Sequence, residues 1–177
     1  MPSLSLLALP TESLRNTQVD YSSQKSLVSA LVGTEAVVSA IATQSVDIQD
    51  TVLEAAVSAK VKFFILSEFG LASNNPRLNR DFSIWANKVR FQERLAALKS
   101  EGRIDYTLVL TGLFLNWGMD GFLIDVKNKS IELWDGGDRP IPMTSMPSIG
   151  KAIVALLQGK AKGRSEVRLK DINISQK

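Results

Sequence analysis

Short apolar runs of strand length alternate along the chain with segments in which apolar residues recur at helical spacing. The clearest strand is the run AVVSAI at 36–41, and KFFIL at 62–66 is a second buried run. Between them, residues 46–59 repeat apolar positions at helical spacing, which predicts a crossover helix joining two parallel strands. This alternation is typical of an α/β fold.

The rest of the chain continues the pattern. Ser23 is expected to cap a helix that ends at Gly33, and a long helix is predicted at 82–99, with Phe82, Trp85, Val89 and Leu95 on its apolar face. Shorter strands are expected at 4–9, 17–20, 106–111, 131–134 and 166–169, and a further helix at 149–157. We expect one domain over residues 1–177, with helices on both faces of a mostly parallel sheet.

Composition narrows the chemistry. The 177 residues include no Cys and no His, so Ser-His-Asp and Cys-His catalysis are excluded. Lys, Tyr, Ser and carboxylate side chains remain as groups that could transfer protons. No metal site is expected. The net charge of +3 is too small to predict nucleic-acid binding. The apolar opening residues are too short for a membrane span, so we expect a cytoplasmic protein.

Three blocks in order carry a resemblance to a known family. They are SEFG at 67–70, TGLFLNW at 111–117, and LWDGG at 133–137 leading to SIGKA at 148–152. In this order and spacing, the set resembles the NmrA-like/isoflavone-reductase family of atypical short-chain reductases. The resemblance implies a Rossmann-like domain that binds NAD or NADP and reduces a small, possibly aromatic, secondary metabolite. It also places Lys88 where the family has its catalytic lysine.

The chain departs from the family pattern at several positions. No Gly precedes Gly33, so the glycine-rich turn that binds the pyrophosphate in full-length members is missing, and with it the usual first βα unit. Leu9 or Pro10 stands where an Arg would meet a 2′-phosphate, and Leu113 and Asn116 replace a usual Pro and Asp. The segments that close the substrate pocket in the family are also largely absent, so the chain is expected to be truncated at both ends.

The resemblance and the strand ends together give a candidate site, because open α/β sheets bind ligands at the carboxyl ends of their strands. Lys88 is the candidate catalytic residue and a cofactor contact; its alternative is a solvated helix lysine. The other candidate cofactor contacts are Asp20, Ser39, Ala40, Ile41, Ser67, Glu68, Phe69, Gly70, Thr111, Gly112 and Phe114. The competing interpretation of Asp20 is a turn or helix-start residue. The competing interpretation of Phe114 and Trp117, which could instead line the nicotinamide and substrate pocket, is core packing.

Two other functions stay open at this point. One is a non-catalytic dinucleotide-sensing or regulatory binding protein, and the other is an inactive truncated relic. The missing central strand of such a relic would leave backbone edges unpaired, which predicts a homo-oligomer or a protein partner bound through an exposed sheet edge. For an active protein, the expected partner is a small-molecule substrate.

Overall fold

The computed structural model describes residues 16–42, 45, 48–76, 85–119, 121 and 123–177. Within it the chain forms two compact units. The first contains residues 1–67 and 82–107, and the second contains residues 68–81 and 108–177. The expected strand at 4–9 and the start of the long helix at 82 lie outside the described residues.

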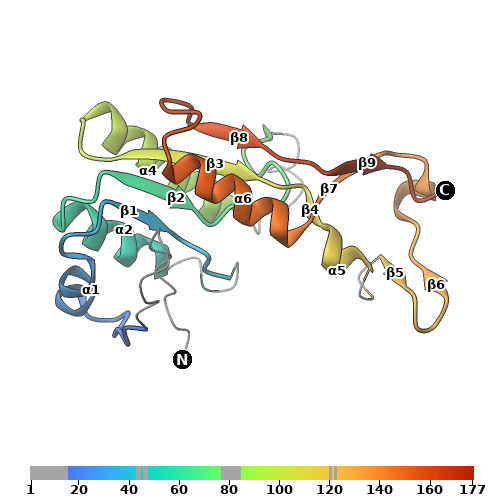
Figure 1. Cartoon of the computed structure of the whole chain (residues 1–177), viewed down its shortest axis with the longest axis horizontal. Coiled ribbons are helices and arrows are strands. Elements are labelled where there is room, and N and C mark those ends of the chain that lie inside the picture. The colour runs from blue at the N-terminus through green and yellow to red at the C-terminus, as the bar shows by residue number, and fades with distance from the viewer. Residues whose placement is uncertain (1–15, 43–44, 46–47, 77–84, 120, 122) are drawn as a thin grey trace. The chain divides into compact units, whose positions relative to one another are not determined.

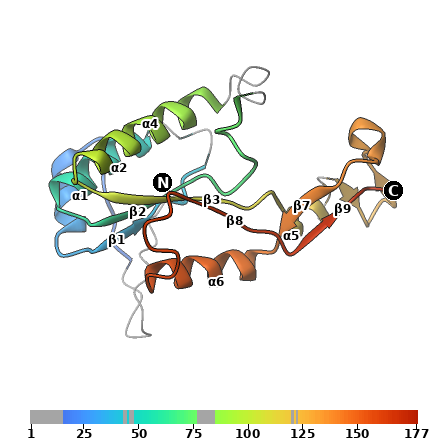
Figure 2. The ribbon, with the colours of Figure 1, turned by 90° about the horizontal axis from the view of Figure 1, so that it is seen from above.

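The first unit alternates helices and strands (Figure 1). Its elements are α1 (Gln24–Leu31), β1 (Ala36–Val38), α2 (Ile48–Ser58), β2 (Phe63–Leu66) and α4 (Ala86–Ser100), and β3 (Asp105–Leu110) begins in it and continues into the second unit. Figure 2 shows α1, α2 and α4 on one face of β1 and β2. The expected crossover helix between two buried strands is therefore present.

The four-stranded sheet has the order β1-β2-β3-β8, where β8 is Glu166–Arg168. β1 pairs with β2 in parallel, with Val37 opposite Phe64, and β3 pairs with β8 in parallel, with Val109 opposite Val167. The apolar runs predicted to be buried do form these strands, because a parallel strand covered on both faces needs apolar residues at successive positions. The α/β class with a parallel sheet is confirmed.

Local sequence signals account for the helix ends in the first unit. Ser23 caps α1, because its side chain accepts a hydrogen bond from the backbone N–H of Ser26. Gly33 follows with a φ of +78°, the left-handed conformation that glycine adopts most readily after a helix. The strand expected at 17–20 is reduced to a single bridge residue, Thr17.

The buried face of the long helix α4 differs from the face predicted from the sequence. Its buried face consists of Lys88, Phe91, Gln92, Leu95 and Leu98, whereas Trp85 and Val89 are only half-buried. Phe91 meets Phe64 of β2, with 6.3 Å between the ring centroids. Two polar residues on the buried face misled the prediction, because a search for apolar periodicity assigns them to the solvent side.

The second unit combines short strands with one amphipathic helix. Its elements beside β3 and β8 are β4 (Leu113–Phe114), α5 (Leu115–Met119), β5 (Ile124–Asp125), β6 (Ser130–Ile131), η3 (Trp134–Gly137), β7 (Ile141–Thr144), α6 (Met146–Leu157) and β9 (Ile172–Ile174). β4, β7 and β9 form a three-stranded sheet and β5 pairs with β6. The strand expected at 131–134 was wrong beyond Ile131, because the chain turns into η3 there.

Candidate functional site

In the first unit, the carboxyl ends of β1 and β2 are joined by hydrogen bonds. The Ser39 N–H donates to the carbonyl of Ile65 at 2.9 Å, and the Ser67 hydroxyl donates to the carbonyl of Ile41 at 2.7 Å. Ser39 and Ser67 are buried, Ile41 is half-buried, and Ala40 is exposed. The structure thus brings together Ser39, Ile41 and Ser67, as the parallel pairing of two strands requires.

A residue that sequence reasoning missed lies beneath these strand ends. Gln49, in the first turn of α2, is buried, with 1% of its surface exposed. Its Oε1 accepts hydrogen bonds from the Ser39 hydroxyl at 3.0 Å and from the Ser67 N–H at 3.4 Å. The available signal was its position three residues before Val52, on the buried face of α2. A glutamine on that face needs partners in the core.

The other end of the Gln49 amide has no such partner. Nε2 is buried and makes no hydrogen bond with the part of the chain that the structure describes. Because the Ser67 backbone N–H can only donate, the atom that receives it must be the amide oxygen, which fixes the amide orientation. Gln49 therefore presents a buried donor beside the strand ends.

Lys88 is on the buried face of α4, with 8% of its surface exposed. The spacing from Lys88 to Phe91, Gln92 and Leu95 is that of one helix face. Lysine is rarely buried, because removing an ammonium group from water is costly unless it has partners. The interpretation of Lys88 as a solvated helix lysine is therefore wrong.

Asp20 lies in an exposed turn before α1. Its Oδ1 accepts hydrogen bonds from the Ser22 hydroxyl at 2.6 Å and from the Ser22 N–H at 2.9 Å. These two bonds favour the carboxylate and lower the pKa of Asp20. The geometry is that of the turn interpretation, and an adenine contact by Asp20 stays a prediction.

In the second unit, the loop after β2 is held against the loop after β3. The N–H groups of Thr111 and Gly112 both donate to the carbonyl of Gly70, each at 3.1 Å. Further along the first loop, the Asn74 side-chain amide donates to Glu166 of β8 at 2.6 Å. The structure therefore brings Gly70 together with Thr111 and Gly112, and fixes the loop at a second point.

Glu68 is buried in this loop, and the Ser73 hydroxyl donates to its Oε2 at 2.7 Å. Phe69 follows with a φ of 29°, a positive value that is rare for a bulky side chain and marks local backbone strain. The bond to Ser73 shows Glu68 orienting its own loop. A contact of Glu68 or Phe69 with the cofactor stays a prediction.

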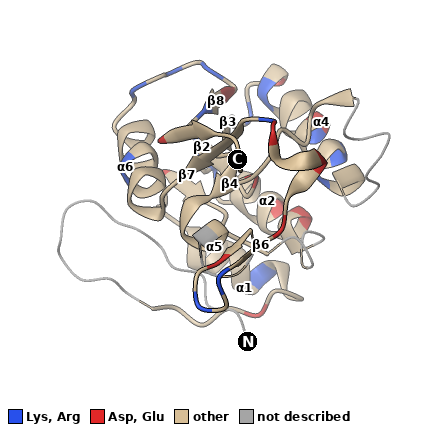
Figure 3. Cartoon of the chain, turned by 90° about the vertical axis from the view of Figure 1, so that its right-hand side faces the viewer, with Lys and Arg blue, Asp and Glu red and all other residues tan. Residues whose placement is uncertain are grey.

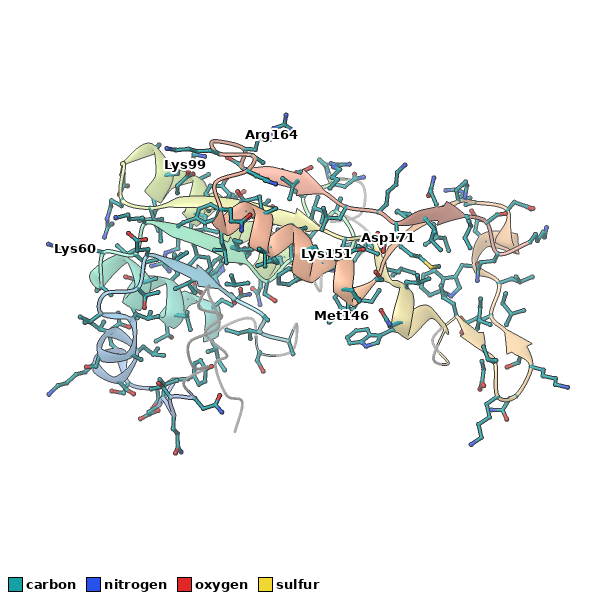
Figure 4. All side chains as sticks on the ribbon, in the orientation of Figure 1. Lys60, Lys99, Met146, Lys151, Arg164 and Asp171 are labelled. Atoms are coloured by element: carbon teal, nitrogen blue, oxygen red, sulfur yellow. The ribbon has the colours of Figure 1, made fainter. Side chains whose placement is uncertain are left out.

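An aromatic pair stands at the start of α5. The rings of Phe114 and Trp117 meet edge to face, with 4.8 Å between centroids and 75° between planes. Trp117 is 64% exposed, so core packing does not explain it. The side chain of Asn116, between them in the chain, accepts a hydrogen bond from the N–H of Met146, which is labelled at the start of α6 in Figure 4.

The surface charge and the hydropathy of the helices were also compared with the features of the site. Figure 3 shows both signs of charge on α4. Among the described residues, no cluster of acidic side chains has the arrangement of a metal site. None of the helices described is long and apolar enough to cross a membrane.

Two characterised oxidoreductases match part of this chain in sequence. The oxidoreductase poxI of Penicillium oxalicum is 27% identical over 139 residues, which is 76% of this chain and 44% of that protein. The oxidoreductase aprR of Aspergillus flavus is 27% identical over 136 residues, covering 76% of this chain and 46% of that protein. The chain thus spans less than half the length of these relatives.

Solved structures that the chain resembles include reductases. A complex of AtPrR2 with NADP+ and (+)-pinoresinol has a TM-score of 0.71 at 22% identity, over 88% of this chain and 53% of that one. An isoflavone reductase has a TM-score of 0.65 at 18% identity, over 89% of this chain and 52% of that one. These matches show the Rossmann-like reductase fold. The model of the NmrA-like family matches residues 12–170, and the chain belongs to that family.

Proposed function

We propose that the protein is an NAD(P)H-dependent oxidoreductase that acts on a small, possibly aromatic, secondary metabolite. The observation that carries the proposal is the burial of Lys88 on α4, at the position where the resemblance to the family puts its catalytic lysine. Family membership and the resemblance to an NADP+ complex support the same function. The nucleotide would supply the hydride.

The described residues fit part of a dinucleotide. The first unit offers the carboxyl ends of β1 and β2, where Ala40 is exposed and Ile41 half-buried above the buried Ser39 and Ser67. Open α/β sheets bind ligands at strand ends of this kind. The chain has no glycine before Gly33, so we assign the pyrophosphate to no residue.

Lys88 would deliver a proton to the reduced carbon skeleton or position the substrate through its ammonium group. A positioned acid or base contributes typically about 10²- to 10⁴-fold to a reaction rate. Burial on a helix face restricts the side chain to few rotamers, which suits a group that must be held in one geometry.

The aromatic pair in the second unit motivates the substrate class. An exposed tryptophan ring that meets a phenylalanine edge to face offers a flat apolar surface to a planar ring. This surface fits the aromatic ring of a small ligand. The AtPrR2 complex contains (+)-pinoresinol, a property of that protein.

Calorimetric titration of the purified protein with NADPH and with NADH tests the proposal first. We expect saturable binding of one or both nucleotides below millimolar concentration. Absence of binding by both at millimolar concentration would overturn the proposed function. Oxidation of the bound NADPH, followed by its absorbance, is then measured with a panel of aromatic ketones and enones. Binding without any turnover would favour the dinucleotide-sensing alternative.

A further inference from the structure

We propose that Gln49 is a positioning residue of the nucleotide site, whose amide oxygen sets the spacing of the carboxyl ends of β1 and β2. The inference rests on the proposed function, because it assumes that these strand ends line the site. No feature of the resemblance singled out this residue. The geometry of a buried amide shared by two strands carries it.

One atom links the two strand ends. Oε1 of Gln49 accepts from the Ser39 hydroxyl, one residue beyond β1, and from the Ser67 N–H, one residue beyond β2. These bonds come from α2, the helix that joins the strands, so the contact is made within one βαβ unit. Ser39 and Ser67 are thus held at a fixed separation by a side chain that touches neither strand's ladder.

The Ser39 hydroxyl is the group whose direction this bond decides. A serine hydroxyl rotates freely unless a partner fixes it, and here its proton is committed to Gln49 Oε1 at 3.0 Å. Ser39 is fully buried, so the bond acts beneath the strand ends and holds the backbone beyond β1 in place. Without Gln49 the two strand ends would be free to shift relative to each other, and the site would lose its preorganised arrangement.

Gln49 is the polar member of the buried face of α2. The rest of that face is apolar, formed by Val52, Leu53, Ala55 and Ala56. Nε2 is buried without a partner among the described residues, which costs about 1–3 kcal/mol for a donor of this kind. A methionine of similar length would remove this unpaired donor, but it would leave the Ser39 hydroxyl and the Ser67 N–H without their acceptor. What the glutamine adds at this position is therefore the pair of bonds between its oxygen and the two strand ends.

The test compares Gln49→Met with Gln24→Met, which lies at an exposed position of α1. The methionine at position 49 removes the oxygen that accepts from Ser39 and Ser67, whereas the methionine at position 24 replaces a surface amide. Calorimetric titration with NADPH gives the dissociation constant, and urea unfolding gives the stability of each variant. We expect Gln49→Met to weaken NADPH binding by roughly tenfold, by analogy with supporting residues around other sites. We expect Gln24→Met to bind NADPH as tightly as the natural protein.

Each outcome has a defined meaning. Equal NADPH affinity of Gln49→Met and the natural protein would overturn the inference, and so would an equal loss of affinity in Gln24→Met. Failure of the natural protein itself to bind NADPH and NADH would instead overturn the proposed function. If Gln49→Met does not fold, Ser39→Ala removes one of the two bonds to Oε1. An unchanged NADPH affinity in folded Ser39→Ala then overturns the inference, and a weaker one supports it.

Discussion

Gly112 lies so close to Pro142 that no side chain fits between them. A Cβ built at residue 112 would stand 2.1 Å from the carbonyl oxygen of Pro142, which is backbone and cannot swing away. Gly112 also has a φ of +63°, a conformation that disfavours any residue with a Cβ. This glycine therefore allows the chain leaving β3 to pass directly beside β7.

Gly112→Ala is expected to destabilise the protein strongly. The left-handed backbone conformation costs about 1–2 kcal/mol for a residue with a Cβ, and the collision with Pro142 adds to it because the strand must move. We expect the free energy of unfolding to fall by more than about 2 kcal/mol. Urea unfolding followed by tryptophan fluorescence measures the change.

Gly163→Ala is the matched control for that substitution. Gly163 has a φ of +82°, yet a Cβ there would meet no atom within 4 Å. Gly163→Ala should therefore show only the conformational penalty of about 1–2 kcal/mol. Equal losses for the two variants would show that the approach of residue 112 to Pro142 does not limit the fold.

Ser73→Ala tests whether the buried bond to Glu68 orders the loop after β2. Removing the hydroxyl takes away a donor that lies 2.7 Å from a buried carboxylate oxygen. We expect a loss of about 1–3 kcal/mol in the free energy of unfolding, because the carboxylate remains buried with fewer donors. The exposed Ser130→Ala serves as the control. If the two alanine variants are equally stable, the loop does not depend on this bond.

The sequence allowed the first unit to be predicted better than the second, for a physical reason. β1 and β2 are buried on both faces and leave uninterrupted apolar runs, and Ser23 and Gly33 are strong signals for the ends of α1. β7 was missed because Pro142 interrupts it, and proline cannot donate to a ladder, which argues against a strand. β4 has two residues, too few for any periodicity.

The candidate site was also predicted only in part. Strand ends such as Ser39, Ser67 and Thr111 follow from knowing where buried strands stop. Gln49 and the burial of Lys88 did not follow, because a polar residue on a helix is assigned to solvent unless tertiary contacts are known. Helical spacing from Val52 to Gln49 and from Leu95 to Lys88 was the one available signal.

Lys88→Met tests the catalytic role of the buried lysine. If the ammonium group serves proton delivery, kcat for an aromatic substrate should fall by about 10²- to 10⁴-fold even at saturating NADPH. The kcat of Lys88→Arg should fall nearly as far, because a guanidinium keeps the charge and does not release its proton. Lys25→Met, at an exposed position of α1, is the control. Full activity of Lys88→Met would remove the lysine from the mechanism.

Asp171 provides a test of the second unit through its response to pH. Its Oδ2 accepts from the Ser145 hydroxyl at 2.6 Å and from the Ser145 N–H at 2.9 Å, directly before α6 (Figure 4). These bonds, with smaller contributions from the Ser148 hydroxyl and the charge of Lys151, lower the pKa of Asp171.

The lowered pKa fixes the sign of the effect. A carboxyl group that binds its proton less tightly when folded stabilises the fold above its ordinary pKa of 3.8, and this contribution is lost as the pH falls through the lower folded value. Asp171→Asn should therefore be less stable than the natural protein near neutral pH. The difference in the free energy of unfolding should shrink as the pH falls through that acidic window.

Ser145→Ala tests the cause of the shift in the same range. Without the hydroxyl, which is the largest contribution, the pKa of Asp171 should rise toward its ordinary value, as carboxyl NMR titration can measure. Asp125, whose pKa is lowered by Asn128 within its own turn, is an internal control that should not change. Because Ser145 also caps α6, the variant should lose about 1 kcal/mol of stability as well. An unchanged pKa of Asp171 in Ser145→Ala would show that the contact with Ser145 is not kept in solution.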